Sequence, residues 1–344
     1  MIKVLVVDDS ALVRQLLSHM LSQAPDIKVV GSAEDPYQAR EMIKSLNPDV
    51  LTLDVEMPKM DGISFLRNLM KLRPMPVIMI STLTEKGAAV TLEALSLGAI
   101  DYIAKPKSDL SNKLLAYQDD LIAKIRLAAR CNVRPSSIIP PQPAASTTGE
   151  KHKLKSRLIA IGASTGGTEA IAQIIAQLPD NFPPIVIAQH IPAAFSASFA
   201  RRLDGKSAMT VHEAKGNEQL KPGHVYVAPG DKHLTVRRQG AHLYTRLEDT
   251  EPVNRHKPSV EVLFNSIAKE AAKTTIGVML TGMGKDGAEA MLNLRNQGAH
   301  TLVQDEATSV VWGMPGAAVD VGASQEQQPL GRIAPRLLQL LKID

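Results

Sequence analysis

A glycine-rich stretch in the second half of the chain has residue types that could carry out nucleophilic catalysis. Residues 162–166, GASTG, follow an apolar run and fit the pattern G-x-S-x-G around Ser164. A tight turn from a strand into a helix needs small residues to expose a serine hydroxyl, and the helix N-terminus supplies free N–H groups. The same composition is also typical of a phosphate-binding loop or of close packing, although the P-loop and dinucleotide-binding patterns are both missing.

Two further residues could complete a serine site. His190 follows the apolar run 185–189, and Asp286 lies in a glycine-rich loop after the apolar run 275–281. A serine nucleophile needs an adjacent base, and the base needs an acid to orient it. Each has a plainer interpretation, His190 as a cap or core-edge histidine and Asp286 as the N-cap of the next helix. The order Ser–His–Asp differs from the familiar serine-hydrolase orders, so it neither supports nor excludes a triad.

A second group of reactive side chains lies in the first half, at the ends of three separate apolar runs. These residues are Asp8, Asp9, Asp54 and Lys105. Clustered carboxylates repel one another unless a divalent cation joins them, and an all-oxygen donor set suits Mg²⁺. Such a cation lets Asp54 attack a phosphoryl group while Lys105 neutralises the incoming charge. Any one of these residues alone fits a solvated surface turn, but three strand ends in one sheet favour a site.

Both sites depend on elements that bring strand ends to one edge of a sheet. In the first half, five apolar runs alternate with amphipathic stretches, which predicts a parallel sheet covered on both faces. With strand order 2-1-3-4-5, the acids and the lysine converge at the switch point. The predicted strands are 2–7, 27–31, 50–55, 77–81 and 99–104. The first predicted helix begins after Ser10, which can act as its N-cap. The other predicted helices cover 36–46, 63–72, 84–97 and 113–130.

The second half predicts a doubly wound, mostly parallel α/β domain with an antiparallel hairpin insertion. Its predicted strands are 157–163, 185–189, 275–281 and 299–304, and its predicted helices are 169–178, 194–203, 260–272 and 288–297. The region 209–247 differs, because alternating runs at 224–228 and 234–247 replace the helical period. The second run is broken at Gln239-Gly240, so we interpret this region as antiparallel hairpin structure.

A stretch rich in proline, serine and threonine separates the halves. Residues 131–153 show neither helical nor strand periodicity, which predicts a linker. The chain has 344 residues and 44% hydrophobic residues, enough for about two globular domains. We therefore expect a first domain at 1–125, a linker at 126–153 and a second domain at 154–344.

Composition excludes several classes of protein. The net charge is only +4 and aromatic residues are 3%, so no nucleic-acid partner is expected. A single cysteine, Cys131, excludes an internal disulfide framework. No apolar run reaches about 18 residues, so no membrane insertion is expected. The N-terminus lacks the pattern of a signal peptide, and a cytoplasmic protein is therefore expected.

The first half resembles response-regulator receiver domains. The motifs are VLVVDDS, LTLDVEMPKMDG, Ser81 after an apolar strand, Tyr102, and KP at Lys105. The resemblance covers about residues 1–125 and implies a flavodoxin-like (βα)₅ fold in which a histidine kinase donates a phosphoryl group to Asp54. Ser81 would hydrogen-bond that group, and Tyr102 would follow it as an aromatic switch. The implied Mg²⁺ ligands are Asp8, Asp9, Asp54 and the backbone carbonyl of Glu56.

The second half resembles the catalytic domain of chemotaxis protein-glutamate methylesterases. The motifs AIGASTGGTEAI, AQHIP, HVYVAPGDKH, PVNRHKPSVEVLF and TGMGKDGAEAM carry this resemblance, which runs from about residue 157 to 325. It implies that Ser164 attacks a glutamate γ-methyl ester on the cytoplasmic helices of a chemoreceptor. His190 would move the serine proton to leaving methanol, and Asp286 would hold the imidazolium.

The same resemblance assigns supporting roles and a second reaction. The backbone N–H of Met283 would bind the oxyanion, and Thr165 would support the site. Selected receptor glutamines would be deamidated through the same tetrahedral intermediate, and no cofactor is expected for the esterase reaction. The unphosphorylated receiver would restrict access to the serine until phosphorylation of Asp54 loosens the contact.

Three alternatives stay open. A transcription regulator is one, although no helix-turn-helix or basic stripe is evident. A nucleotide- or phosphate-binding module that uses both glycine-rich loops is the second, and a receiver-controlled hydrolase of a different ester is the third. Arg255, His256 and Lys257 form a basic cluster near a helix start, which we interpret as solvated rather than as a contact for acidic receptor helices.

Overall fold

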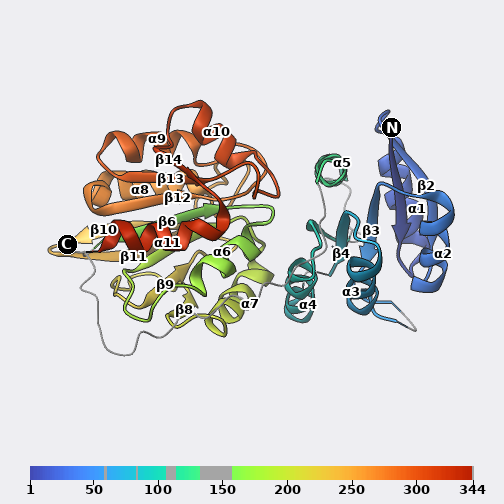
Figure 1. Ribbon diagram of the computed structural model, residues 1–344, viewed down its shortest axis with the longest axis horizontal. Helices are drawn as coiled ribbons and strands as arrows, with labels where there is room; N and C mark the ends of the chain where they lie inside the picture. Colours follow the sequence, from blue (N-terminus) through green and yellow to red (C-terminus); the bar gives the residue numbers. More distant parts are fainter. Residues whose placement is uncertain (58–59, 83, 106–113, 132–156, 343–344) are drawn as a thin grey trace. The chain divides into compact units, whose positions relative to one another are not determined.

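The computed structural model describes residues 1–57, 60–82, 84–105, 114–131 and 157–342 (Figure 1). The chain forms two compact units, Met1–Ile138 and Ile139–Asp344. Their division falls inside the predicted linker 126–153, of which residues 132–153 lie outside the described part. Helix α5 (Leu114–Ala128) continues past residue 125, so the start of the predicted linker belongs to the last helix of the first unit.

The first unit is a five-stranded parallel sheet with the order β2-β1-β3-β4-β5, which confirms the predicted topology. Its strands are β1 (Ile2–Val7), β2 (Ile27–Ala33), β3 (Val50–Asp54), β4 (Val77–Ser81) and β5 (Asp101–Ala104). The helices between them are α1 (Ala11–Ser22), α2 (Pro36–Leu46), α3 (Gly62–Leu72) and α4 (Glu85–Ser96). The central strands β3 and β4 are buried throughout because helices cover both faces.

Side-chain caps fix where these helices begin. Ser10 accepts a hydrogen bond from the backbone N–H of Val13, as predicted, and Asp35, Asp61 and Thr84 cap the next three helices in the same way. Each cap satisfies an otherwise unpaired N–H of the first turn. The caps keep the loops after the strands short, which holds the residues at the strand ends in place.

The second unit is a seven-stranded parallel sheet with the order β14-β13-β12-β6-β7-β9-β8. Its strands are β6 (Leu158–Ala163), β7 (Ile185–Gln189), β8 (Thr210–Glu213), β9 (His224–Val227), β12 (Thr275–Met279), β13 (His300–Gln304) and β14 (Glu326–Gln328). Its helices are α6 (Gly167–Ile175), α7 (Ala193–Asp204), α8 (Val260–Ala271), α9 (Ala288–Asn296), α10 (Met314–Asp320) and α11 (Leu330–Leu341). Figure 1 shows α8, α9 and α10 on one face of the sheet and α6, α7 and α11 on the other, so the sheet is doubly wound.

The prediction of antiparallel hairpins across 209–247 was only partly right. The antiparallel pair is β10 (His233–Gln239) with β11 (His242–Glu248), whereas β8 and β9 pair in parallel at the edge of the main sheet. Alternation of polar and apolar residues is the same in both kinds of edge strand, so it does not reveal strand direction. The segment that connects β8 to β9 contacts the hairpin, because the Leu220 N–H donates to the Leu243 carbonyl of β11 at 2.8 Å.

A glycine brings α8 unusually close to the sheet near Ser164. A Cβ atom at Gly162 would lie 2.3 Å from Cγ1 of Val260, the first residue of α8. Gly162 is the residue before the last one of β6 and lies two positions before Ser164. The small residue is therefore needed for packing between the strand and the helix, in addition to any need of the turn itself.

We predict that Gly162→Ala destabilises the second unit by about 1–3 kcal/mol, because the added methyl overpacks a closed contact. Gly205→Ala is the matched control, since a Cβ there would lie 3.8 Å from its nearest neighbour and the backbone is right-handed helical. That control should be neutral or stabilising by up to about 1 kcal/mol. Urea unfolding of the full chain, followed by the fluorescence of its single tryptophan, Trp312, measures both. Equal stability of the two variants would contradict the packing argument.

Candidate functional site

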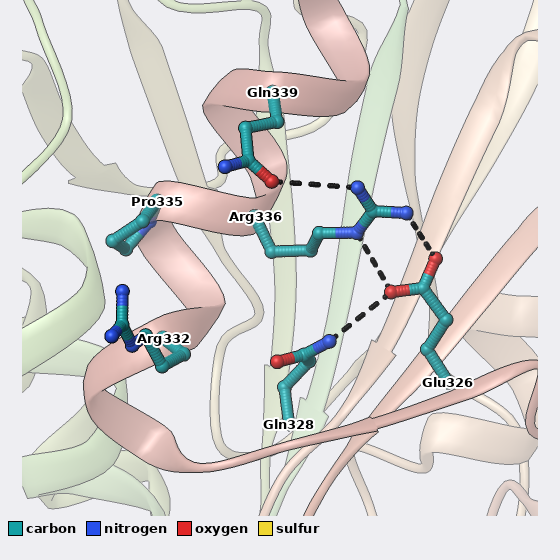
Figure 2. A pocket seen from close by; sticks show the side chains of 6 residues that line it. All are labelled: Glu326, Gln328, Arg332, Pro335, Arg336 and Gln339. Atoms are coloured by element: carbon teal, nitrogen blue, oxygen red, sulfur yellow. Dashed lines mark hydrogen bonds and ion pairs between the residues drawn. The ribbon is translucent and has the colours of Figure 1, made fainter.

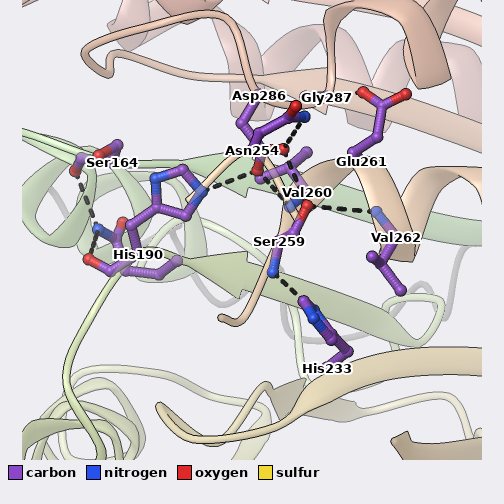
Figure 3. A network of polar contacts seen from close by, with 11 residues as sticks. Ser164, His190, His233, Asn254, Ser259, Val260, Glu261, Val262, Asp286 and Gly287 are labelled. Carbon is purple, nitrogen blue, oxygen red and sulfur yellow. Dashed lines mark hydrogen bonds and ion pairs between the residues drawn. The ribbon is translucent and has the colours of Figure 1, made fainter. Parts of the chain in front are cut away.

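The three side chains predicted for the serine site lie at one edge of the second sheet. Ser164 follows β6, His190 follows β7, and Asp286 lies in the loop after β12. Strands β12, β6 and β7 are neighbours in the sheet and run parallel, so their carboxyl ends meet. Figure 3 shows the imidazole of His190 between Ser164 and Asp286.

The His190 imidazole and the Asp286 carboxylate are in direct contact. Nε2 of His190 lies 2.9 Å from Oδ2 of Asp286, and both side chains are buried. The carboxylate accepts four hydrogen bonds within the described residues: from His190, from Asn254 Nδ2 at 2.8 Å, from Ser259 Oγ at 2.8 Å and from the Val260 N–H at 2.7 Å. Burial alone raises the pKa of Asp286, but the hydrogen bonds from His190, Asn254 and Ser259 outweigh it and lower the pKa to about 2. The carboxylate is therefore ionised near neutral pH.

The backbone around Ser164 is held on both sides. Its N–H donates to the Thr281 carbonyl at 3.0 Å, and its carbonyl accepts from Gly167 N at 2.7 Å and from Gln189 Nε2 at 2.9 Å. Across the described ranges, no hydrogen bond joins the Ser164 hydroxyl to the imidazole. In the same residues, His190 Nδ1 is buried without a hydrogen-bond partner. That nitrogen lies on the side of the ring away from Asp286, toward Ser164 (Figure 3).

Asp286 does not cap the helix that follows it, contrary to the plainer interpretation of this residue. Gly287 is the N-cap of α9, and the Asp286 carboxylate instead binds the first N–H of α8 at Val260. In exchange, Glu261 in the first turn of α8 accepts a hydrogen bond from Gly287 N at 3.1 Å. The N-termini of α8 and α9 are thus tied to each other through two carboxylates, which fixes the loop that carries Asp286.

The loop that carries Met283 approaches the serine closely. A Cβ atom at Gly282 would lie 2.8 Å from Cβ of Ser164, so a glycine is needed at this approach. The half-buried Met283 comes next in the chain, and within the described residues its backbone N–H donates to no acceptor. Thr165 is buried, and its carbonyl accepts a hydrogen bond from Thr281 Oγ1 at 3.0 Å. The loop that carries the free N–H of Met283 therefore lies directly beside the backbone of Ser164.

Sequence reasoning missed a layer of polar residues behind the carboxylate. Asn254 and Ser259 bind Asp286 directly, and the fully buried His233 accepts from the Ser259 N–H through Nδ1 at 3.2 Å. The other nitrogen of His233 lies 3.1 Å from the Glu251 carbonyl, which makes Nε2 the protonated position. Asn254 and Ser259 lie in the PVNRHKPSVEVLF motif, but the motif alone did not indicate that both side chains bind Asp286.

The prediction that residues 255–257 form a solvated basic cluster was wrong for His256. Its ring stacks on the His190 ring with centroids 3.7 Å apart and planes 9° from parallel. Lys257 pairs with Asp249 at 2.7 Å, and Arg255 is exposed. The sequence did not show that these three residues have different surroundings, because His190, the contact partner of His256, is 66 positions away.

The acidic residues of the first unit converge as predicted. Carboxylate oxygens of Asp8, Asp9 and Asp54 lie within 4.8 Å of one another, and Lys105 Nζ lies 2.7 Å from Asp54 Oδ2 and 3.4 Å from Asp8 Oδ2. Burial raises the pKa of Asp54 to about 6, with Lys105 opposing and Asp8 adding to the rise. Glu56 donates its N–H to Asp54 Oδ1 at 3.3 Å. This pocket has the donor set of a hard divalent cation.

Ser81 lies at the carboxyl end of β4, and Tyr102 lies within the neighbouring strand β5. Ser81 is buried at the end of β4, where its hydroxyl lies 2.6 Å from that of Thr91 in α4. Tyr102 is half-buried on β5. Lys124 of α5 donates to the Tyr102 carbonyl at 2.6 Å, and its ammonium lies 5.3 Å from the ring centroid.

A separate hollow of about 440 Å³ lies between β14 and α11 (Figure 2). It is lined by Glu326, Gln328, Arg332, Pro335, Arg336 and Gln339. The Arg336 guanidinium already binds Glu326 through Nε at 2.7 Å and Nη2 at 2.6 Å. These two N–H groups of Arg336 are therefore already paired within the protein.

No helix in the described part of the chain is long and apolar enough to span a membrane.

Known families match both units. The CheB methylesterase family model matches residues 159–337, and the response regulator receiver domain model matches residues 4–115. A protein-glutamate methylesterase/protein-glutamine glutaminase 1 of Xanthomonas campestris is 54% identical over 98% of this chain and 97% of its own length. One of the same name, numbered 2, from Saccharophagus degradans is 54% identical over 98% of both chains.

A solved structure supports the same assignment for the second unit. The crystal structure of the Thermotoga maritima CheB methylesterase catalytic domain is 38% identical and covers 54% of this chain and all of its own, with a TM-score of 0.53. The family match, the full-length relatives and the shared fold agree. The chain therefore belongs to the CheB methylesterase family and carries a response regulator receiver domain ahead of its methylesterase domain.

Proposed function

We propose that the second unit hydrolyses glutamate γ-methyl esters on the cytoplasmic helices of chemoreceptors, releasing methanol, and that it deamidates selected receptor glutamines. The names of the full-length relatives support both reactions. The observation that carries the proposal is the buried contact between His190 and Asp286 at the strand ends beside Ser164. It supplies an oriented base next to a serine in the turn that leads into helix α6.

In this mechanism the Ser164 hydroxyl attacks the ester carbonyl while its proton passes to Nδ1 of His190. Nε2 keeps its proton and its hydrogen bond to the ionised Asp286, which stabilises the imidazolium. The tetrahedral oxyanion accepts a hydrogen bond from the free N–H of Met283, and Thr165 helps to hold the turn. His190 then returns the proton to the leaving methoxide, and an acyl-enzyme remains.

Water completes the reaction through the same groups. His190 takes a proton from water, the resulting hydroxide attacks the acyl carbon, and Ser164 leaves with the proton that His190 returns. The product is a receptor glutamate. A glutamine side chain follows the same course with ammonia as the leaving group, because an amide and an ester share the tetrahedral intermediate.

We propose that Asp54 of the first unit accepts a phosphoryl group from a chemotaxis histidine kinase. Asp8, Asp9, Asp54 and the Glu56 carbonyl would hold Mg²⁺, and the fit is supported by an all-oxygen set in which Asp8 Oδ2 is buried and accepts no hydrogen bond within the described residues. The cation supplies charge neutralisation for the incoming phosphoryl oxygens. Lys105 contributes a second positive charge, and Ser81 binds the phosphoryl group.

Regulation would follow from a shift between two states of the chain. Phosphorylation of Asp54 would change the Ser81–Tyr102 face and favour the state in which the esterase is more active. The stimulation is bounded by the difference in contact energy between the states. The proposed kinase and the cytoplasmic helices of the proposed receptors support a cytoplasmic location.

Ser164→Ala should abolish methanol release from methylated receptor membranes, with a loss of at least about 10⁴-fold, because the nucleophile is removed. Headspace methanol measured against the intact chain tests this, and unchanged urea unfolding of the variant confirms that it folds. Substantial release by the variant would exclude Ser164 as the nucleophile.

Asp286→Asn should lower kcat by roughly 10³–10⁴-fold while changing KM little. An asparagine amide can donate to Nε2 of His190, which moves the ring proton to Nδ1 and removes the acceptor for the serine proton. Asp180→Asn, at an exposed carboxylate, is the matched control and should keep full activity. A kcat within tenfold of wild type for Asp286→Asn would contradict the assigned role.

Asp54→Asn should keep the basal esterase rate and lose all stimulation by a small-molecule phosphodonor, because the acceptor carboxylate is gone. Asp119→Asn, exposed on α5, should still be stimulated. Initial methanol-release rates with and without the phosphodonor and Mg²⁺ measure both variants. Stimulation of Asp54→Asn would show that coupling does not run through this residue.

A further inference from the structure

A tight turn at residues 253–256 contacts both members of the His190–Asp286 pair. The backbones of Val253 and His256 exchange two hydrogen bonds, of 3.1 Å and 2.9 Å. Between them, Asn254 and Arg255 have φ angles of 53° and 69°. This is the left-handed geometry of a two-residue turn in which glycine is preferred at the second position.

The two ends of this turn reach different partners. The Asn254 amide donates to Asp286 Oδ1 at 2.8 Å, and the His256 ring stacks on His190 at a centroid distance of 3.7 Å. Left-handed backbone at Arg255, a residue with a long side chain, costs energy that the surrounding contacts must offset. The turn therefore places the Asn254 amide against Asp286 and the face of the His256 ring against His190.

We propose that His256 is a positioning residue that acts through His190, an inference that rests on the proposed roles of Ser164, His190 and Asp286. The stacked ring fixes the plane of the His190 imidazole. With Nε2 held by Asp286, the plane then determines where Nδ1 points. That nitrogen is the one that takes the serine proton.

The stack also stabilises the charged form of His190. A cation that faces an aromatic ring is attracted by its π electrons, so the stacked His256 ring favours the imidazolium that forms when the serine proton is transferred. Asp286 binds Nε2 of His190, and Glu261 lies near Asp286 through its hydrogen bond from the Gly287 N–H. The exposed Arg255 and Lys285 lie on the adjoining loops, and Lys257 pairs with Asp249.

Phenylalanine and leucine at position 256 separate stacking from simple packing. Both fill space without titrating, but only phenylalanine presents a π face. We expect His256→Leu to lower kcat about tenfold with KM within twofold, because the base loses its orientation. We expect its acid limb in the pH profile of kcat/KM to move about 0.5–1 unit toward lower pH, since His190 loses the stabilisation of its charged form. His256→Phe should retain most of kcat and the wild-type limb.

His242→Leu, at an exposed position on the hairpin, is the matched control and should match wild type in both kcat and the pH profile. Equal kcat and equal acid limbs for the leucine and phenylalanine variants would overturn the proposal, because packing alone would then explain the contact. So would a leucine variant whose kcat and acid limb match those of wild type.

A fluorophosphonate separates this proposal from the mechanism on which it rests. Attack by the activated serine oxygen on phosphorus forms the Ser164–phosphonyl bond and releases fluoride, with the serine proton going to His190. Slower labelling of Ser164 in His256→Leu, restored in His256→Phe, supports the positioning role. Normal labelling in all variants overturns the positioning role alone, whereas a wild-type chain labelled elsewhere overturns the serine mechanism as well.

Discussion

The carboxylate of Asp286 is the group on which the catalytic unit depends. A buried charge is unfavourable unless hydrogen bonds compensate for lost water, and here four donors come from three separate parts of the described chain. Those donors are His190 after β7, Asn254 in the turn before α8, and Ser259 and Val260 at the N-terminus of α8. One ionised group thereby ties together the elements around Ser164, the proposed nucleophile.

Each unit has a buried carboxylate at the carboxyl edge of its own parallel sheet, but the pKa values of the two carboxylates are shifted in opposite directions. Burial acts on both Asp54 and Asp286, yet it raises the pKa of the first to about 6 and is overcome at the second, whose pKa falls to about 2. The difference lies in the donors, because Asp54 has the Lys105 ammonium beside another carboxylate, whereas Asp286 has a full set of hydrogen bonds. Since its pKa is depressed, Asp286 stabilises the fold above its ordinary pKa, and this contribution is lost as the pH falls toward 2.

Close backbone approach is the second constraint on the catalytic unit. Added Cβ atoms at Gly162 and Gly287 would both lie within 2.4 Å of the Val260 side chain, and one at Gly282 would press on Ser164. The N-terminus of α8 therefore sits between the strand that carries the serine and the loop that carries the acid. Gly287 also has a φ of 86°, so its conformation and its packing both require glycine.

Much of the protein was predictable from sequence because its signals are local. Periodicity located the strands of the receiver, the doubly wound architecture supplied their order, and Ser10 marked a helix start. Positions at strand ends, together with family resemblance, singled out Ser164, His190, Asp286 and Asp54. Only the tertiary structure decided the parallel pairing of β8 with β9, the binding of Asp286 to α8 instead of α9, and the stacking of His256 on His190. Each of these is a contact between segments far apart in the chain, and neither hydrophobic period nor capping chemistry encodes which distant segment a side chain meets.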